Sequence, residues 1–391
     1  MLYSAFQGIQ LPRLGLGCMR FPKLEGTSEA IDHDKARAMI HRAYEAGVNY
    51  FDTAYRYHGG ESETFVGEVL SLYPRDSFYL ASKMPGHMME FVDGQYRFTG
   101  ALKERAPMPP RELFLSQLQR CQVDYFDFYM LHNLCETAYE FYSDPDLGVL
   151  DELIRQKDAG RIRYLGFSAH GRAETLDSYL NEHPGVFQFA QIQLNYLDWT
   201  LQDARSKCEV LAKHGLPLLV MEPVRGGRLA ALTESQTEIL RSFRPDASPA
   251  EWAFRFLQTL PGVQLVLSGM SSMAQLEENI ATFCEEKPLT QPEWDALMKI
   301  GAEMTGGVPC TSCRYCVEDC PVGLNIPKLL SMYNESVSVP NAFTMGFTLG
   351  AMSESELPSA CLSCGACSRA CPQNIDIPSA LSKFAALLSA I

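Results

Sequence analysis

The sequence CTSCRYCVEDCP at residues 310–321 recurs as CLSCGACSRACP at residues 361–372, and this duplicated run decides how the end of the chain folds. Each run carries three cysteines in a Cys-x2-Cys-x2-Cys pattern, followed after three further residues by a Cys-Pro pair. Thiolates at this spacing ligate iron-sulfur clusters of the 4Fe-4S type. Zinc favours paired Cys-x2-Cys knuckles, and disulfide frameworks belong to small secreted chains, so both alternatives fit the runs less well.

The two runs resemble the bacterial ferredoxin modules that bind two clusters. In such modules the fourth cysteine of each run ligates the cluster that the other run holds. The resemblance implies one cluster bound by Cys310, Cys313, Cys316 and Cys371, and a second bound by Cys361, Cys364, Cys367 and Cys320. The spacing leaves open whether these clusters carry electrons or only stabilise the tail.

Length and composition indicate two domains. The chain has 391 residues, 46% of them hydrophobic, which is enough for one large core and a small appended module. The sequence MTGGVP at residues 304–309 interrupts the helical periodicity, so we expect domains at residues 1–300 and 301–391. The segment between the two cysteine runs predicts a helix over residues 327–334, with proline at its start.

Charge and hydropathy exclude some classes of partner. The formal net charge is -14, from 33 basic and 47 acidic side chains, which disfavours a nucleic-acid surface. No apolar run reaches the length of about 18 residues that a membrane helix needs, and the first residues lack the pattern of an export signal. The remaining cysteines are scattered singly, as free thiols in a reducing compartment are. We therefore expect a cytoplasmic protein without membrane or nucleic-acid partners.

The part of the chain before the cysteine runs alternates short β-rich apolar stretches with amphipathic helical ones. This alternation is typical of repeated βα units and a parallel sheet. Helical stretches at residues 33–46 and 61–72 follow the first two strands. The predicted strands are residues 14–17, 50–53, 78–82, 126–131, 163–167, 189–194, 218–221 and 264–267.

Eight such units predict an α/β fold of the (β/α)8 TIM-barrel type, followed by a small α-helical ferredoxin-like domain. A doubly wound sheet is the alternative, but no G-x-G-x-x-G sequence follows the first strand to support it. Active sites of these barrels lie at the carboxyl ends of the strands. Polar residues at those ends are therefore the candidates for function.

Four such residues combine into a proton-delivery site. Asp52 ends the second strand, Tyr57 follows five residues later, Lys83 ends the third strand and His132 ends the fourth. An ammonium near a phenol favours the phenolate, so we expect Lys83 to lower the pKa of Tyr57 toward the range of a general acid. Asp52 would offset the buried charge of Lys83, and His132 would orient a carbonyl oxygen.

The motifs around these residues resemble the aldo-keto reductase superfamily over roughly the first 285 residues, and with the cysteine tail its iron-sulfur branch. They are FDTAYRYHGGESE at 51–63, ASKM at 81–84 and DFYMLHN at 127–133. The resemblance implies a nicotinamide cofactor, hydride transfer between a carbonyl and an alcohol, and Tyr57 as general acid or base. Asp52, Lys83 and His132 match the other members of the family's catalytic tetrad.

Three further motifs resemble the family's cofactor-binding segments. They are IRYLGFS at 162–168, QIQLNY at 191–196 and LSGMSSMAQLEENI at 267–280, and the helix in the third would turn its amino end toward a phosphate. The implied contacts are Ser168 and Gln193 to the carboxamide, Glu278 and Asn279 to the adenine, and Ser268, Gly269, Ser271 and Gln275 nearby.

The sequence departs from the family pattern in three places. Ala169, followed by His170, replaces the asparagine after the family's serine. No lysine or arginine occurs at 256–286 to bind a ribose 2′-phosphate, which favours NADH over NADPH. Met221, Glu222 and Arg225 stand where many members carry an aromatic residue that stacks on the nicotinamide.

The sequence PGHMMEFVDGQYRFTG at 85–100 is a long connection rich in methionine and aromatic residues. Long loops on barrels often cover active sites, so we predict a lid, a substrate wall or a dock for the tail. Irregular core packing is the alternative. The residues concerned are Met88, Met89, Phe91, Tyr96 and Phe98.

These observations predict an oxidoreductase for a small carbonyl or alcohol substrate, with NAD(H) or NADP(H) and two 4Fe-4S clusters that exchange electrons with a redox partner protein. Hydride transfer moves two electrons at once and a cluster moves one, so a flavin in the nicotinamide position stays an open alternative. Two other readings stay open as well: the clusters are only structural or oxygen-sensing, or the barrel is catalytically silent in an electron-transfer subunit.

Overall fold

The computed structural model describes residues 1–27, 29–106, 108–308, 310, 315–338, 343–371 and 375–389. The chain forms two compact units, which we describe separately. The first comprises Met1–Asn195 and Ser206–Trp294, and the second comprises Tyr196–Arg205 and Asp295–Ile391. Within the described ranges, no helix has the length and apolar character needed to cross a membrane.

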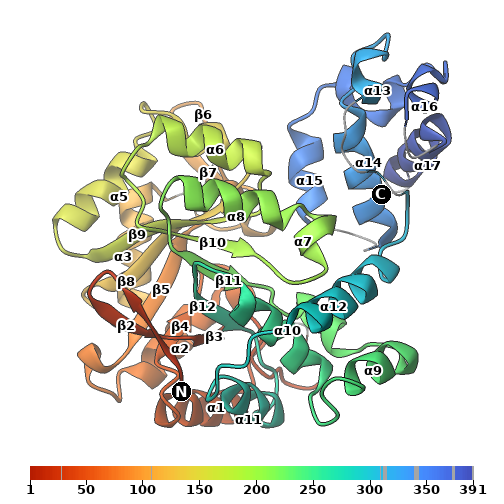
Figure 1. Ribbon diagram of the computed structural model, residues 1–391. Helices are drawn as coiled ribbons and strands as arrows, with labels where there is room; N and C mark the ends of the chain where they lie inside the picture. Colours follow the sequence, from red (N-terminus) through yellow and green to blue (C-terminus); the bar gives the residue numbers. More distant parts are fainter. Residues whose placement is uncertain are drawn as a thin grey trace. The chain divides into compact units, whose positions relative to one another are not determined.

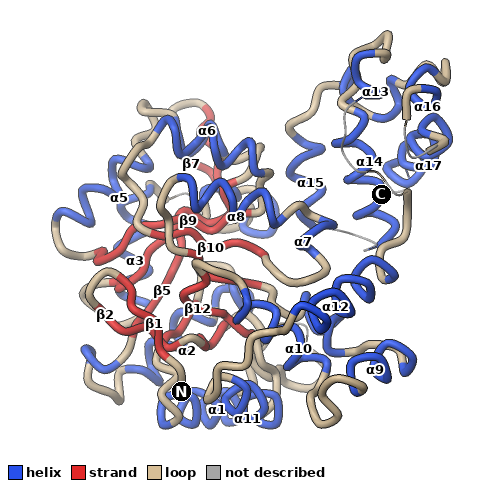
Figure 2. The backbone as a smooth tube through the Cα atoms, in the orientation of Figure 1, coloured by secondary structure: helices blue, strands red, loops and turns tan. Residues whose placement is uncertain are grey.

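The first unit is built on a closed barrel of eight parallel strands, shown as a central ring in Figures 1 and 2. Each predicted strand is present to within three residues at its ends, and the closed order β3-β4-β5-β8-β9-β10-β11-β12 excludes the doubly wound alternative. The TIM-barrel prediction is therefore confirmed. The strands are β3 (Leu14–Gly17), β4 (Tyr50–Asp52), β5 (Tyr79–Met84), β8 (Phe126–Leu134), β9 (Ile162–Ala169), β10 (Phe189–Gln193), β11 (Leu218–Met221) and β12 (Val263–Ser268).

Helices surround the strands, as Figure 2 shows. They pack there because an amphipathic helix turns its apolar face toward the core. In the first helix Ala36, Met39, Ile40 and Ala43 form the buried face, and the Asp32 side chain caps the amino end by accepting from the Lys35 N–H. The helices of this unit are α1 (His33–Glu45), α2 (Ser62–Leu70), α3 (Pro110–Arg120), α4 (Tyr139–Ser143), α5 (Val149–Asp158), α6 (Ala173–Glu182), α8 (Ala204–Lys213), α9 (Glu234–Arg241), α10 (Pro249–Thr259) and α11 (Met273–Thr282).

Two hairpins that the strand pattern did not predict complete the barrel unit. β1 (Tyr3–Phe6) and β2 (Ile9–Pro12) precede β3, and their Phe6 and Leu11 pack on inward-facing residues such as Phe128 and Leu265, so the hairpin closes the amino end of the barrel. β6 (Met89–Val92) and β7 (Gln95–Phe98) form the second hairpin, in the long connection after β5.

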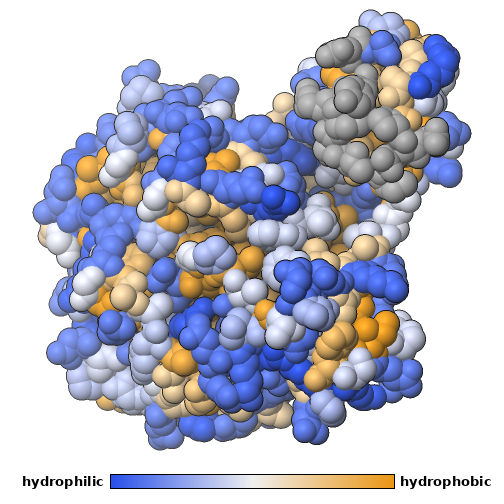
Figure 3. All heavy atoms as spheres, in the orientation of Figure 1, coloured by the Kyte–Doolittle hydropathy of each residue, from blue (hydrophilic) through white to orange (hydrophobic). Residues whose placement is uncertain are grey.

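The surface shown in Figure 3 is mostly polar, with hydrophobic side chains in small groups.

The second unit is helical in its described residues and repeats one arrangement twice. α13 (Tyr315–Glu318) contains the third cysteine of the first run, and α16 (Ala366–Arg369) contains the third cysteine of the second. Each run is then followed by a helix that begins with Ile-Pro, α14 (Ile326–Ser338) and α17 (Ile377–Ser389), and these two helices contact each other. The predicted helix at 327–334 is thus confirmed. The unit also contains α7 (Asp198–Leu201), most of α12 (Gln291–Glu303) and α15 (Phe343–Gly350).

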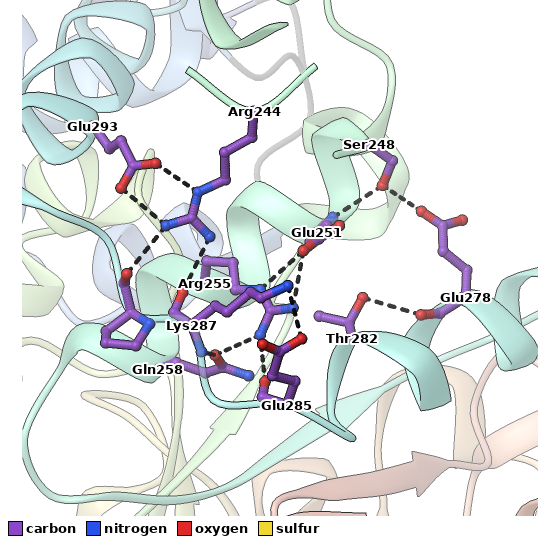
Figure 4. A network of polar contacts seen from close by, with 11 residues as sticks. Arg244, Ser248, Glu251, Arg255, Gln258, Glu278, Thr282, Glu285, Lys287 and Glu293 are labelled. Atoms are coloured by element: carbon purple, nitrogen blue, oxygen red, sulfur yellow. Dashed lines mark hydrogen bonds and ion pairs between the residues drawn. The ribbon is translucent and has the colours of Figure 1, made fainter. Parts of the chain in front are cut away.

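A network of polar contacts joins α10 and the loop before it to α11, to the segment at 285–288 and to the start of α12 (Figure 4). Arg244 donates through Nε and Nη2 to the two carboxylate oxygens of Glu293, at 2.5 and 2.9 Å, and also binds backbone carbonyls of 287 and 288. The Glu293 side chain is only 9% exposed. Hydrogen bonds from Arg244 lower the pKa of Glu293 to about 2.

We expect Arg244→Ala to cost about 2–3 kcal/mol of unfolding free energy at pH 7, because the buried Glu293 carboxylate loses its cation. A carboxyl group whose pKa is lower in the folded protein than in the unfolded chain stabilises the fold fully at a pH above the unfolded pKa. This stabilisation is lost as pH falls toward the folded pKa, so the cost of Arg244→Ala should shrink between about pH 4.5 and about pH 2. Urea unfolding at several pH values, followed by tryptophan fluorescence, measures it. Arg241→Ala is the control, because its pair with Glu234 is 51% and 73% exposed and should contribute about 0–1 kcal/mol. Equal costs for the two variants would contradict this assignment.

Candidate active site

The four predicted catalytic side chains meet at the carboxyl ends of neighbouring strands. Asp52 is the last residue of β4, Lys83 lies in β5 and His132 in β8, while Tyr57 begins the short 3-10 helix η1 (Tyr57–Gly60) after β4. The Lys83 ammonium donates to Asp52 Oδ1 at 2.5 Å and to the Tyr57 hydroxyl at 3.3 Å. It also donates to the Thr53 carbonyl at 2.9 Å. The closed strand order brings these residues together because β4, β5 and β8 are consecutive neighbours.

The Lys83 side chain is a buried cation with a full set of acceptors. Burial lowers the pKa of Lys83, but Asp52 and Tyr57 raise it more, and the net value lies above that of an ordinary lysine. The second oxygen of Asp52 accepts from Gln191 Nε2 at 3.1 Å. Asp52 is therefore held on both sides, and Lys83 stays charged beside the phenol.

The net pKa shift of Tyr57 is opposite to the predicted one. Burial raises the pKa of the Tyr57 phenol above its ordinary value of 10.0 and outweighs the opposing effect of Lys83. The prediction that Lys83 brings this pKa below the ordinary value was therefore wrong, because the sequence shows the neighbouring charge but not the depth of burial. At neutral pH the phenol keeps its proton and can donate it.

His132 lies beside Tyr57 as a neutral imidazole. The ring centroids of His132 and Tyr57 are 6.2 Å apart at 85°, and those of His132 and His87 are 4.6 Å apart. Burial lowers the pKa of His132 well below 6.5, and His87 and Lys83 lower it further. Its Nδ1 atom has no hydrogen-bond partner among the described residues. A neutral imidazole offers one N–H donor to an oxygen that enters this site.

Some residues of this site were missed by the sequence reasoning. Gln191 lies on the same inward face of β10 as Gln193. The period-two alternation of the sequence QIQ could have indicated this, because alternate residues of a strand share a face. His87 lies in the short 3-10 helix η3 (Gly86–Met88) that follows β5. The Tyr142 hydroxyl donates to the carbonyls of both Met84 and His132, at 2.9 and 2.7 Å. No sequence signal shows that Tyr142 joins the two strand ends, because α4 lies far from β5 along the chain.

The segments predicted to hold the nicotinamide lie on β9 and β10. Ser168 is 2% exposed and Gln193 7% exposed, and Ser168 pairs in register with Gln191. Ser168 Oγ accepts from the backbone N–H of Asn133 at 3.0 Å. A β-bulge in β8 sets His132 and Asn133 opposite Ser168, since Leu131 pairs with Phe167 and Leu134 with Ala169.

The six residues predicted to bind the rest of the nucleotide gather at the end of β12 and on α11. Asn279 Nδ2 donates to the Ser268 hydroxyl at 3.0 Å, and the Ser271 N–H donates to Gln275 Oε1 at 2.8 Å. Glu278 accepts from Ser248, as Figure 4 shows. Gly269 is exposed beside them.

Arg20 is a cation at this end of α11 that the sequence reasoning missed. The Ser271 hydroxyl donates to the Arg20 carbonyl at 2.8 Å, and a Cβ on Gly269 would lie 3.1 Å from the Arg20 side chain. The Arg20 guanidinium lies 3.6 Å from the carboxylate of Glu222, which follows β11 and is one of the residues that differ from the family pattern.

His170, which follows Ala169, belongs to another of these differences from the family pattern. Burial lowers the pKa of His170 to about 3.

The long connection after β5 packs partly against the catalytic turn. Met89 and Phe98 are buried, and the Phe98 ring stacks on Tyr55 at 5.8 Å, two residues before Tyr57. Phe91 is 44% exposed, and the Tyr96 hydroxyl donates to the Leu147 carbonyl at 2.6 Å. The prediction that this segment is a lid, a substrate wall or a dock stays a prediction.

One cavity of the second unit brings together cysteines from both runs. Cys320 of the first run and Cys361, Cys364 and Cys367 of the second all line one small pocket. In the described part of the chain no three potential ligands lie close enough to hold a single metal ion. Cys310, Cys316 and Cys371 pack on the same hydrophobic core, and Cys313 lies outside the described residues.

Comparison with known proteins identifies the family. The model of the aldo/keto reductase family matches residues 13–302, and that of a 4Fe-4S dicluster domain matches residues 309–375. The chain belongs to the aldo/keto reductase family and carries a 4Fe-4S dicluster domain after the barrel. It is therefore an oxidoreductase of the aldo-keto reductase type, as the motifs indicated.

Relatives and solved structures agree with this assignment. The uncharacterized oxidoreductase YqkF of Bacillus subtilis is 27% identical over 305 residues, covering 74% of this chain and 92% of the relative. The NADH-specific methylglyoxal reductase of Escherichia coli is 25% identical over 313 residues, covering 70% of this chain and 90% of that protein. The holo structure of aldo-keto reductase AKR11C1 from Bacillus halodurans is 26% identical, with a TM-score of 0.59, and covers 77% of this chain and 96% of its own.

Proposed function

We propose that the barrel interconverts a small carbonyl compound and its alcohol by hydride transfer, with Tyr57 as the general acid and base. The observation that carries the proposal is the contact of one buried ammonium, Lys83, with both Asp52 and the Tyr57 hydroxyl. A surface or structural ion pair would not need the phenol as a third member.

In the reduction, Tyr57 gives its proton to the carbonyl oxygen and becomes a phenolate, which Lys83 stabilises. A bound reduced nicotinamide supplies the hydride that the carbonyl carbon accepts, and the product is the alcohol. His132 donates an N–H to the same oxygen and orients it. Solvent returns a proton to Tyr57 after each turnover, and alcohol oxidation runs through the same steps in reverse.

The residues available for the nicotinamide fit a carboxamide and a dinucleotide. Ser168 and Gln193 are buried polar groups on β9 and β10; β9 pairs with β8, which carries His132, and β10 is the next strand of the barrel. Ser268, Gly269, Ser271, Gln275, Glu278 and Asn279 lie at the end of β12 and along α11, and complete the proposed nucleotide contacts. A flavin in the nicotinamide position is the alternative to this part of the proposal.

We propose NADH as the preferred cofactor. Residues 256–286 contain no lysine or arginine, and Arg20, a cation that the structure brings to the end of β12, already faces the Glu222 carboxylate. A 2′-phosphate at this place would lack charge-assisted bonds worth roughly 1.5–3 kcal/mol each. The E. coli relative is by its name NADH-specific.

The cysteine runs would bind two 4Fe-4S clusters with ligands exchanged between the runs. The shared cavity of Cys320 with Cys361, Cys364 and Cys367 supports this ligand set. Cys310, Cys313, Cys316 and Cys371 would bind the other cluster. The clusters supply single-electron transfer when bound, and we propose a redox partner protein that exchanges these electrons in the cytoplasm. In this proposal residues 1–300 form the reductase domain and 301–391 the cluster domain.

Anaerobic purification, iron and sulfide analysis, and titration with NADH and NADPH test the proposal. We expect NADH to bind at least about tenfold more tightly than NADPH, because one lost charge-assisted bond already corresponds to that ratio. Slow bleaching of the cluster absorbance by NADH would support electron exchange between the two cofactors, and its absence would favour clusters that are structural or oxygen-sensing. Failure of both nucleotides to bind would refute the hydride mechanism.

A further inference from the structure

A fully buried carboxylate, Glu63, lies behind the catalytic residues and takes no part in the mechanism above. Glu63 is the second residue of α2, directly after the turn that carries Tyr57, and its side chain is 0% exposed. Burial raises the pKa of Glu63 above its ordinary value of 4.5 and outweighs the lowering effects of Arg120, Ser82 and Gln117. Burying a carboxylate costs free energy, so the groups that bind the Glu63 carboxylate indicate which segments of the chain it holds in place.

One set of contacts joins Glu63 to the strand that carries Lys83. The Ser82 hydroxyl and Gln117 Nε2 both donate to Glu63 Oε1 at 2.6 Å. Gln117 Nε2 also lies 3.1 Å from the Lys83 carbonyl, which accepts from it. The Tyr129 hydroxyl donates to Gln117 Oε1 at 2.5 Å and fixes the orientation of the amide. Glu63 thus holds β5 at Ser82 and, through Gln117, at Lys83.

A second set joins Glu63 to the turn that carries Tyr57. Arg120 Nε lies 3.3 Å from Glu63 Oε2, and Arg120 Nη2 donates to the Gly60 carbonyl at the end of η1. The turn has left-handed backbone at three successive residues, with φ of 52° at His58, 63° at Gly59 and 95° at Gly60. A non-glycine residue such as His58 in this conformation is strained and persists only where the surroundings enforce it.

The two sets share one carboxylate, which connects the two catalytic elements independently of the Lys83–Tyr57 contact itself. We propose that Glu63 is a positioning residue that braces the Tyr57 turn against the Lys83 strand through Arg120 and Gln117. The kinetic part of this proposal rests on the hydride mechanism proposed above, and the structural part does not.

Glu63→Gln keeps the shape of the side chain but removes the charge that holds Arg120. We expect kcat to fall about 10- to 100-fold, with KM and the nucleotide Kd changed less than about 3-fold, because a displaced acid slows the chemical step without removing a binding contact. We also expect faster backbone hydrogen exchange in residues 54–61, measured by mass spectrometry on the intact holoprotein. Arg120→Met should have the same two effects, and the double variant should be no slower than the slower single variant.

Unchanged exchange in residues 54–61 of Glu63→Gln would overturn the proposal whatever the activity. Uniformly faster exchange along the whole chain with an unchanged kcat would also overturn it, because Glu63 would then only support the fold. If the wild-type protein turns over no carbonyl compound with either nucleotide, the proposed function fails. The hydrogen-exchange experiment still decides whether Glu63 braces the Tyr57 turn against the Lys83 strand. Glu61→Gln is the charge control, since this neighbouring carboxylate binds His33 and the Ile31 N–H, and its kcat should stay within about 2-fold.

Discussion

Replacing Tyr57 with phenylalanine is expected to lower kcat for carbonyl reduction by about 10²- to 10⁴-fold and to leave the nucleotide Kd nearly unchanged. The variant keeps the ring beside His132 and over Lys83, where the ammonium lies 4.9 Å from the ring centroid. It removes only the hydroxyl, which in the proposed mechanism gives the carbonyl oxygen its proton. Steady-state kinetics under anaerobic conditions, together with nucleotide titration, measure both quantities.

The pH dependence gives this prediction a second readout. Burial raises the pKa of Tyr57, so the protonated form that reduces the carbonyl should persist to at least about pH 9. The pKa of His132 is lowered well below 6.5, so kcat/KM should show no limb near that pH. The wild-type kcat/KM for reduction is therefore expected to stay level from about pH 6 to at least about pH 9, without the falling limb that an acid with a lowered pKa would give.

Tyr55→Phe is a suitable control for Tyr57→Phe. Its ring stacks on Phe98 and lies beneath the guanidinium groups of Arg105 and Arg120, contacts that phenylalanine can also make. It should retain most of the wild-type activity. If Tyr57→Phe instead kept full turnover, the acid would be a different group, and a barrel that serves as the body of an electron-transfer subunit would become the better reading.

The barrel could be predicted from the sequence because every strand carries its own signal. Each of the eight apolar stretches is bounded by polar or glycine-containing turns, and the strand order follows from the chain order in a closed barrel. The β1–β2 hairpin was missed because its strands are short and its two-residue turn, Gln7-Gly8, lacks the usual Asn-Gly or Asp-Gly pair. Its role becomes clear only in the structure, where Phe6 and Leu11 join the core of the barrel.

The candidate site was predictable in its residue types but not in its energetics. The positions of Asp52 and Lys83 at adjacent strand ends predicted their pairing, which the structure shows at 2.5 Å. The net direction of the Tyr57 pKa was not predictable, because it depends on how far the turn is buried. Arg20 and Ser271 are 251 positions apart in the chain and meet only because the barrel closes between β12 and β3.

The cysteine runs provide the second large expected effect, in iron content. We expect Cys316→Ala alone to keep about half of the iron, because only one of two clusters loses a ligand. Adding Cys320→Ala should then remove nearly all of the rest. The reason is the pocket in which Cys320 lies with Cys361 and Cys364 of the other run. Iron and acid-labile sulfide analysis of anaerobically purified protein measures both variants.

The matched control adds Cys371→Ala to Cys316→Ala. If ligands are exchanged between the runs, both substitutions affect the same cluster, and this double variant should still keep about half of the iron. If each run instead bound its own cluster, the results would be reversed: Cys316→Ala with Cys320→Ala would keep half, and Cys316→Ala with Cys371→Ala would lose nearly all. The two double variants differ only in which fourth cysteine is removed. Their comparison therefore separates the two ligand arrangements even if every variant loses some stability.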